Sequence, residues 1–230
     1  MEHFNWTQLF PGVTHDNVHV ATLILVSLGL IIFSVFARFA LGSGEKAVTP
    51  AGQFSIKGVC EVLVEFITGL VDGVIGHHGR YLVPLYGAIF IFIVMNNMAG
   101  LFPGMTPATD NFNTTIAIGI YSFCLYNYLG LKENGLGYLK HFLGPIWWLA
   151  PLMVVIEVIS HLFRPMTLGI RLAANMIGDH KVLSTFLDKT GYIPVSVIFY
   201  GFGLFVCLIQ AYVFVLLSMV YVSMATEHDH

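Results

Sequence analysis

Long runs of apolar residues constrain this chain more than any other feature of its sequence. The first runs from Val18 to Leu41 and is long enough to cross a hydrocarbon core of about 30 Å as an α-helix. Hydrophobic residues make up 57% of the chain and charged residues 10%, whereas an average soluble domain is about 25% charged. A soluble globular enzyme is therefore excluded, and the sequence predicts an all-α polytopic membrane protein.

Further apolar segments are also of membrane length. Residues 81–102 and 114–131 each match one span and are separated by the turn-rich loop PGMTPATDNFN. Residues 146–187 and 193–225 are longer, and as continuous helices they would measure roughly 63 and 50 Å. Such helices fit a bilayer only when strongly tilted, as a hairpin that lies nearly flat in the membrane. Pro165 leaves a second possibility, a break in the first of them.

The segment from 53 to 76 has a different pattern. Apolar residues recur there at helical spacing. The opposite face carries a polar stripe of Lys57, Glu61, Glu65, Thr68 and Asp72. Because such a stripe should not face lipid, we expect an amphipathic helix in the interface or against a partner. The prediction is one membrane domain over residues 1–230, with about five membrane helices and one interfacial helix.

Basic residues indicate the membrane topology. Residues 1–37 and the loop 103–113 contain no Lys or Arg. The alternate loops contain Arg38, Lys46, Lys57, Arg80, Lys132 and Lys140. The positive-inside rule then predicts an outside N-terminus and a cytoplasmic C-terminus. No positively charged n-region precedes the first run, so we expect neither a secretory signal nor a transit peptide, and a bacterial cell (inner) membrane as the location.

Several chemistries find no support in the sequence. Cys60, Cys124 and Cys207 lie in apolar surroundings without metal-ligand spacing, which is typical of small packing residues. HExxH, GxSxG, CxxC and a phosphate-binding glycine loop do not occur. A net charge of −3 without a basic run argues against nucleic acid as a partner. We therefore predict no catalytic residue, no metal and no cofactor.

The strongest functional signal is a polar stripe along the segment 146–187. Its members recur every three or four residues and so share one face of a helix. They are Glu157, His161, Arg164, Leu168, Arg171 and Asn175. A charge at mid-membrane costs about 2.5–3.5 kcal/mol on insertion scales, so it persists where it faces water or a partner. The stripe is therefore predicted to be a functional site.

Arg171 is the clearest member of this stripe. It lies in LGIRLAANM without a carboxylate three or four residues away, because Asp179 follows eight positions later and Glu157 precedes it by fourteen. Arginine cannot lose its charge, since its pKa exceeds about 12. The counter-charge must come from elsewhere in the fold, or from a carboxylate that a partner chain brings.

Two titratable residues are candidates for passing protons. Histidine changes charge near about pH 6.5 and burial tunes glutamate toward neutrality, so His180 and Glu157 suit relay chemistry. Each residue also has a purely structural interpretation. Glu157 could neutralise Arg164 two turns away, and His180 could cap the helix beside Lys181.

Gln210 is the one strongly polar residue in the middle of the last apolar segment. A buried glutamine needs hydrogen-bond partners, and Arg171 or Asn175 across the hairpin would supply them. Interhelical packing without a transport role is the alternative. For Asn96 and Asn97 in the second span, packing is the favoured interpretation.

Two stretches of the chain resemble a known family. EVISHLFRPMTLGIRLAANMIGDH and IQAYVFVLLSMVYVSMATE are similar to the a subunits of F-type ATP synthases, the stator channel of the membrane rotor. The RP…LGIRLxxN pattern and the Q-A-x-x-F…Y-x-S-M-A ending are specific, and the likeness covers most of the chain. The resemblance implies a non-catalytic, proton-translocating subunit that forms two offset half-channels against a rotating c-ring and couples proton flow to rotation and ATP synthesis.

The resemblance also implies roles for single residues. Arg171 corresponds to the stator arginine that faces the ion-binding carboxylate of the c-ring. Asn175 and Gln210 match positions that help to line the outer half-channel, and His180 falls on its access path.

On the cytoplasmic side, Glu157 matches the acidic position of the inner half-channel, and Thr167 matches a small hydroxyl position nearby. His161 and Arg164 on the same stripe are secondary candidates for ion translocation.

The chain departs from the family pattern at one position. Where the family has His on the first helix of the hairpin, the facing helix often carries Glu seven residues before the glutamine, and here that position is Gly203. The outer half-channel is therefore expected to rely on His180, helped by Asp179 and water.

The resemblance implies three kinds of partner: the c-ring, the b subunits of the peripheral stalk against the segment 53–76, and the rest of the synthase in a lipid bilayer. The residues alone leave two rivals. A self-contained ion channel or secondary transporter is disfavoured by the lack of internal repeats and by the unpaired Arg171. A structural membrane anchor would leave the cost of the polar stripe unexplained.

Overall fold

The structure, a computed structural model, is built from helices. It describes residues 6–9, 13–14, 17–41, 55–102, 104–135, 150–190 and 193–226. These residues contain no strand, and their α-helices are α1 (Val18–Leu41), α3 (Ile56–Val74), α4 (Val83–Ala99), α5 (Phe112–Asn134), α7 (Ala150–Thr190) and α8 (Ile193–Thr226). Within this described part, 5 helical stretches are long and apolar enough to cross a membrane. The predicted all-helical membrane fold class is confirmed.

Some parts of the predicted topology lie outside the described residues. These are residues 53–54 of the amphipathic segment, 146–149 of the hairpin, Lys46, Lys140 and the C-terminal residues 227–230. The predicted span 81–102 begins within a 3₁₀ helix, η3 (His77–Leu82), which leads directly into α4.

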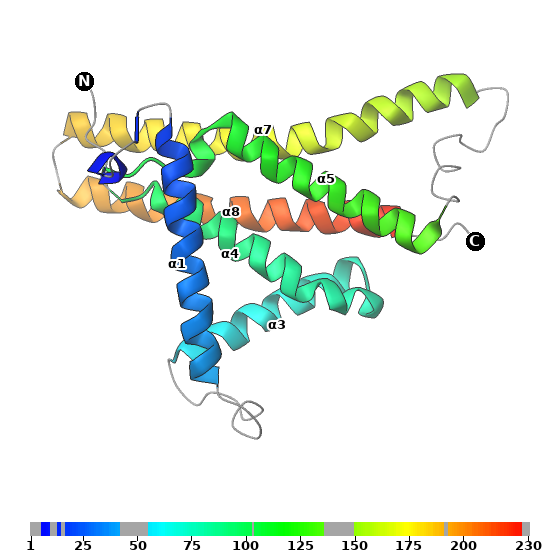
Figure 1. Ribbon diagram of the computed structural model, residues 1–230. Helices are drawn as coiled ribbons and strands as arrows, with labels where there is room; N and C mark the ends of the chain where they lie inside the picture. The colour runs from blue at the N-terminus through cyan, green and yellow to red at the C-terminus, as the bar shows by residue number, and fades with distance from the viewer. Residues whose placement is uncertain are drawn as a thin grey trace.

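α1 runs across the direction of the other long helices, as Figure 1 shows. It packs against α3 and α4 on one side, while large apolar side chains such as Ile31, Phe36 and Phe39 stay exposed. An apolar surface of this kind is a liability in water, whereas in a bilayer it meets lipid tails of similar polarity. Arg38 lies in the last turn of α1, at the opposite end from the N-terminus.

α3 has the amphipathic character that its sequence predicts. Ser55 caps the helix, since its side-chain oxygen accepts the backbone N–H of Lys57 at 3.2 Å. Ile67 and Val71 are fully buried against α4 and its surroundings. By contrast, Val62 is 68% exposed. Part of the apolar face of α3 is therefore left uncovered by the described residues.

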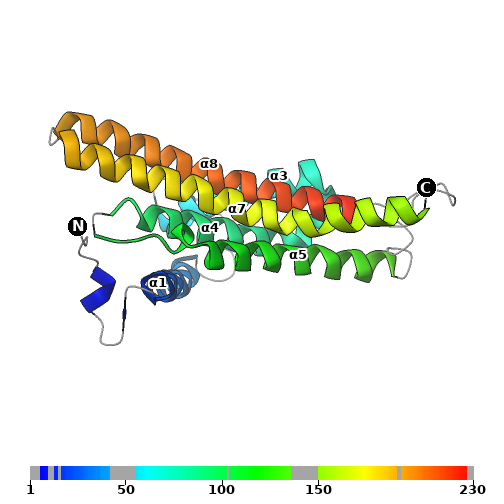
Figure 2. The same ribbon diagram turned by 90° about the horizontal axis from the view of Figure 1, so that it is seen from above.

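α7 and α8 form a long antiparallel hairpin, and Figures 1 and 2 show the two helices side by side. α7 is one helix of 41 residues that continues through Pro165, so the alternative of a break there is wrong. α8 has 34 residues. At 1.5 Å per residue the two measure roughly 62 and 51 Å, so they fit a bilayer core of about 30 Å only when strongly tilted.

α5 and α7 pack closely together at the turn that contains Pro165. A Cβ atom on Gly119 would lie 2.6 Å from the backbone oxygen of Pro165, and one on Gly169 would lie 2.9 Å from that of Thr115. The two glycines thus let two helix backbones touch, as small residues do in membrane proteins. Pro165 removes one backbone donor from α7, and its turn is the one that packs against α5.

The core lies where α4, α5, α7 and α8 meet. Tyr86, Tyr126, Leu172 and Phe214 are at most 1% exposed there. Aromatic and leucine side chains of this size hold the hairpin against the two shorter spans through dispersion contacts. The packed side of α7 is thereby fixed, and with it the direction in which the polar residues of the stripe project.

Candidate ion-translocation site

Arg171 lies near the middle of α7, and its side chain is exposed. The next two residues, Leu172 and Ala173, are fully buried in helix packing. The guanidinium therefore leaves α7 on the side that the chain does not cover. None of the ion pairs that form within the described residues includes Arg171. A counter-charge from the described part of the fold is thus not observed.

One turn after Arg171, a hydrogen bond joins the two helices of the hairpin. Asn175 Nδ2 donates to Gln210 Oε1 at 2.6 Å. Gln210 is 3% exposed, and its Nε2 has no partner among the described residues. The expectation that a polar residue across the hairpin binds Gln210 is confirmed for Asn175. The amide nitrogen of Gln210 is suited to a further hydrogen bond, because a buried donor without a partner is costly.

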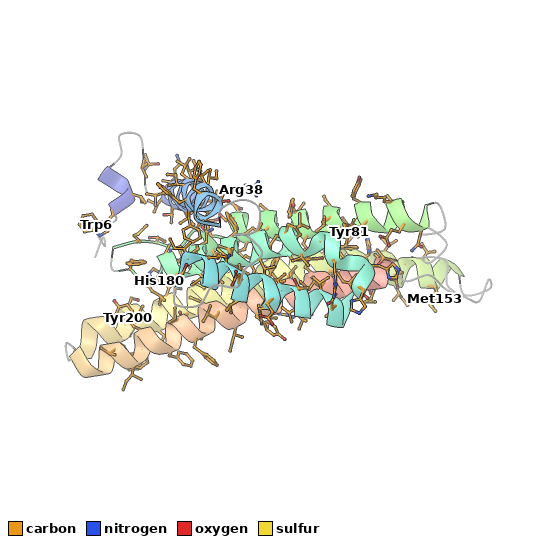
Figure 3. All side chains as sticks on the ribbon, turned by 90° about the horizontal axis from the view of Figure 1, so that it is seen from below. Trp6, Arg38, Tyr81, Met153, His180 and Tyr200 are labelled. Atoms are coloured by element: carbon orange, nitrogen blue, oxygen red, sulfur yellow. The ribbon has the colours of Figure 1, made fainter. Side chains whose placement is uncertain are left out.

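A group of titratable residues gathers near the C-terminal end of α7, where Figure 3 labels His180. His180 Nδ1 lies 3.4 Å from Oδ2 of Asp110, the last residue of the 3₁₀ helix η4 (Ala108–Asp110). Asp179 faces α8, since a Cβ atom on Gly203 would lie 3.1 Å from Asp179 Oδ2. We call Asp110, Asp179 and His180 the His180 group. The contact of His180 thus crosses between elements.

The connection between α4 and α5 that carries Asp110 is itself held by polar contacts. Thr109 Oγ1 donates to Asn97 Oδ1 at 2.8 Å. Asn111 caps α5 by accepting the backbone N–H of Asn113 at 2.9 Å, and its Nδ2 lies 3.4 Å from a ring nitrogen of His19 on α1. Asp110 was not among the predicted site residues. The signal available for it was a carboxylate in a turn-rich loop without basic residues.

A second group lies on the other side of Arg171 along α7. Glu157 Oε1 is 3.5 Å from Arg164 Nη2, and the guanidinium carbon of Arg164 is 5.6 Å from the centroid of the Tyr221 ring on α8. His161, between them, is buried against α5. We call Glu157, His161 and Arg164 the Glu157 group. Thr167 is exposed, and its hydroxyl donates to the backbone oxygen of Arg164 at 3.0 Å.

The predicted stripe follows the border between the packed and the exposed face of α7. His161 and Leu168 lean toward the packed side and are buried, whereas Arg171 and Asn175 are exposed. At 3.6 residues per turn, residues along such a border alternate slightly to either side. Some residues of the stripe are therefore packed against other helices of the chain, and others lie on its uncovered surface.

Comparison with known proteins identifies the family. The model of the ATP synthase A chain family matches residues 19–223. The chain is 54% identical over 228 residues to ATP synthase subunit a of Bdellovibrio bacteriovorus, with 99% of each protein covered. The chain belongs to the ATP synthase A chain family.

Two further relatives are more distant. ATP synthase subunit a of Trichlorobacter lovleyi is 41% identical over 202 residues, which cover 87% of this chain and 84% of the relative. ATP synthase subunit a of Desulfosudis oleivorans is 38% identical over 221 residues, which cover 96% and 93%. This member of the family is the non-catalytic, proton-translocating subunit a of an F-type ATP synthase, as the sequence motifs predicted. It is a bacterial multi-pass membrane protein that works within a larger assembly.

Proposed function

We propose that Arg171 is the fixed stator charge that faces a carboxylate of the rotating c-ring, between two offset half-channels for protons. The observation that carries this proposal is an exposed arginine in the middle of a long membrane helix, without an ion pair among the described residues. A charge at this depth needs a partner. A rotor carboxylate would supply that charge each time it passes.

The proposed motion follows from the cost of charge in lipid. A proton from outside neutralises the rotor carboxylate, and the neutral group enters lipid cheaply, whereas the ionised one does not. Beside Arg171 the opposite charge favours the ionised carboxylate, so its proton leaves toward the cytoplasm. The same guanidinium interrupts a direct proton wire between the two half-channels. A potential of 100 mV supplies about 2.3 kcal/mol per proton to bias the direction.

The His180 group supports an outer half-channel. We place the N-terminus outside and the C-terminus in the cytoplasm, following the distribution of basic residues. The start of α1 lies near this group, because η4 contacts both α1 and α7 and Asn111 lies 3.4 Å from His19 of α1. Protons would pass from Asp110 and His180 to Asp179, and then toward Asn175 and Gln210 beside Arg171.

Asp179 accounts for the departure from the family pattern. Its carboxylate lies against Gly203, which leaves room for it on α8. The family pattern expects an acidic side chain from α8 at this place. Here Gly203 has no side chain, and the carboxylate of Asp179 from α7 takes that place instead. We infer that Asp179 contributes the acid and His180 the base of the outer path.

The Glu157 group and Thr167 support the inner half-channel. Glu157 is about four helical turns from Arg171 on the side toward the α7 N-terminus. Figure 3 places Met153, one turn before Glu157, at the opposite end of the molecule from His180. Protons released beside Arg171 would pass Thr167 and reach the Glu157 carboxylate, which Arg164 holds in position at 3.5 Å.

α3 supports a contact with the b subunits of the peripheral stalk. Its polar stripe and the uncovered apolar residues Val59 and Val62 suit a partner helix at the membrane surface. Cross-linking from Glu61 or Glu65 in the whole synthase should capture a stalk chain. Capture of lipid alone would count against this contact.

The decisive experiment measures proton flux into vesicles that contain the whole synthase. Arg171→Ala should abolish ATP-driven pumping, while passive flux under an imposed potential is kept or raised, because the barrier between the half-channels is gone. Arg38→Ala on α1 is the matched control and should pump normally. Unchanged pumping by Arg171→Ala would refute the proposal. Ion flux by the purified chain alone would favour a self-contained channel.

A further inference from the structure

His161 is a buried histidine with hydrogen-bond partners on α5. It is 8% exposed. Its Nε2 lies 2.9 Å from Asn127 Oδ1. The hydroxyl oxygen of Tyr126 lies 3.1 Å from Nδ1 and 3.3 Å from Nε2. The Phe123 ring packs edge-on at 5.0 Å between centroids. Neither composition nor spacing pointed to these partners.

The amide of Asn127 favours one tautomer of His161. Asn127 Nδ2 donates to the backbone oxygen of Phe123 at 2.8 Å, which leaves its Oδ1 directed at the histidine. An amide oxygen only accepts hydrogen bonds, so His161 Nε2 carries the hydrogen. The Tyr126 hydroxyl, which is nearer to Nδ1 than to Nε2, can then donate its hydrogen to Nδ1. Both ring nitrogens are used in the neutral form.

This arrangement does not suit a proton relay through the ring. A relay would take up a proton at one nitrogen and release one from the other. The exit at Nε2 faces the amide oxygen of Asn127, which is a very weak base. The entrance at Nδ1 is occupied by the hydroxyl of Tyr126, itself 1% exposed. The geometry therefore favours a positioning role.

Contacts connect His161 to the ion pair of its own helix by way of α8. The Tyr126 ring lies 6.1 Å from the ring of Tyr221. The guanidinium carbon of Arg164 lies 5.6 Å from that ring of Tyr221. Arg164 in turn lies 3.5 Å from Glu157. A rotation of α7 about its axis would change the two contacts that α7 makes with its neighbours, that of His161 with Tyr126 and that of Arg164 with Tyr221.

We propose that His161 is a positioning residue for proton release to the cytoplasm. Its two hydrogen bonds to α5 fix the rotation of α7, and thereby hold Glu157 and Arg164 at the border of the exposed face. The inference rests on the proposed function of Glu157 in the inner half-channel. It goes beyond that function by giving His161 the role of a neutral latch and by excluding it from the path of the proton.

The test compares His161→Leu with His161→Gln in vesicles that contain the whole synthase. Leucine removes both hydrogen bonds, and misplacement by about 1 Å can cost on the order of 100-fold in rate. We expect about a tenfold loss of ATP-driven pumping, because α7 itself stays packed. Glutamine does not titrate but can donate to Asn127, so it should keep at least about half of the flux. Tyr126→Phe should lie between the two.

The pH profile separates positioning from relay. With the cytoplasmic face turned outward, the medium sets the pH on the release side. His161→Gln should keep the wild-type pH profile of passive flux. A relay role predicts that His161→Gln and His161→Leu lower flux equally and that both remove one limb of the pH profile of passive flux. That result would overturn the proposal. His78→Leu, an exposed histidine on η3, is the matched control and should behave as wild type.

A double-mutant cycle tests whether His161 acts through Glu157. If it does, His161→Leu should lower flux about tenfold in the wild-type background and less than about twofold in Glu157→Gln. Equal effects in both backgrounds would overturn the proposal. Arg171→Ala in the same vesicles keeps the two ideas apart. Normal pumping by Arg171→Ala would refute the stator function. Loss of pumping by Arg171→Ala, together with wild-type pumping by His161→Leu, would refute only the positioning role of His161.

Discussion

The two polar groups on either side of Arg171 are built in different ways. The members of the His180 group come from η4 and α7, and Asp179 also faces α8. The contact of His180 with Asp110, at 3.4 Å, links residues that are 70 positions apart in the chain. The Glu157 group lies within two turns of α7, and only its supports come from other helices. The first therefore depends on how the chain folds, whereas the second depends mainly on helical periodicity.

The two histidines of these groups show the same difference in their surroundings. The side chain of His180 is 32% exposed and faces a carboxylate. His161 is 8% exposed, and its partners are a hydroxyl and an amide. A histidine that reaches solvent beside an acid can exchange protons, while one locked between neutral groups holds helices together. The proposed roles of the two histidines, proton transfer for His180 and positioning for His161, follow from this difference.

The largest expected effect comes from making the same two substitutions, to leucine and to glutamine, at each of these histidines. His180→Leu and His180→Gln should both lower coupled proton flux by at least about 100-fold, because neither side chain takes up and releases a proton near neutral pH. His161→Gln should remain active. Flux at several values of pH on the outer side measures this, since loss of His180 should also flatten the dependence on outer pH. Rescue of His180 by glutamine would break the comparison.

An intermediate effect is expected at Gly203, which borders the His180 group. A Cβ atom there would lie 2.8 Å from Leu101 Cδ2 and 3.1 Å from Asp179 Oδ2, so Gly203→Ala must displace one of them. We expect roughly a threefold to tenfold loss of coupled flux. Gly201→Ala is the matched control on the same helix, because a Cβ atom there meets nothing within 4 Å. Equal flux in the two variants would show that Asp179 tolerates displacement.

Much of the fold could be predicted because lipid imposes long apolar runs. α1 spans Val18–Leu41, the run read from the sequence, and the long hairpin follows from its length alone. The continuity of α7 at Pro165 could not be predicted. That turn packs against Gly119 of α5, and the approach of two backbones leaves no periodic signal in either segment.

The candidate site likewise contains residues that the sequence reveals and residues that only the structure reveals. Arg171 and Gln210 are isolated polar residues in apolar helices, so their cost makes them visible in the sequence. Asp110 lies in a polar loop, where a carboxylate costs little. The lack of basic residues in that loop is a weak signal, and the role of Asp110 follows only from its contact with His180. Tyr126 and Asn127 are equally ordinary in a span rich in tyrosine and asparagine. Their role follows only from facing His161.

The smallest expected effect concerns a second acid–arginine pair, which sharpens the contrast with Glu157 and Arg164. Arg80 donates from Nε and Nη2 to the two carboxylate oxygens of Asp72 at 2.9 and 2.7 Å, where α3 turns into η3. The pair lies outside the polar stripe of α7 and is exposed. Its geometry is better than the 3.5 Å contact of Glu157 with Arg164, yet solvent screens it.

These hydrogen bonds from Arg80 lower the pKa of Asp72 below its ordinary value, and the nearby His77 acts in the same direction. Because the folded-state pKa is the lower one, the stabilisation is complete above the unfolded-state pKa of about 4 and is lost as pH falls through the folded-state value. Asp72→Asn should therefore lower the melting temperature of the purified synthase slightly at neutral pH. The difference from wild type should vanish in acid, with proton flux per assembled complex unchanged at neutral pH. A flux defect as large as that of Glu157→Gln would mean that the turn after α3, like the stripe on α7, takes part in transport.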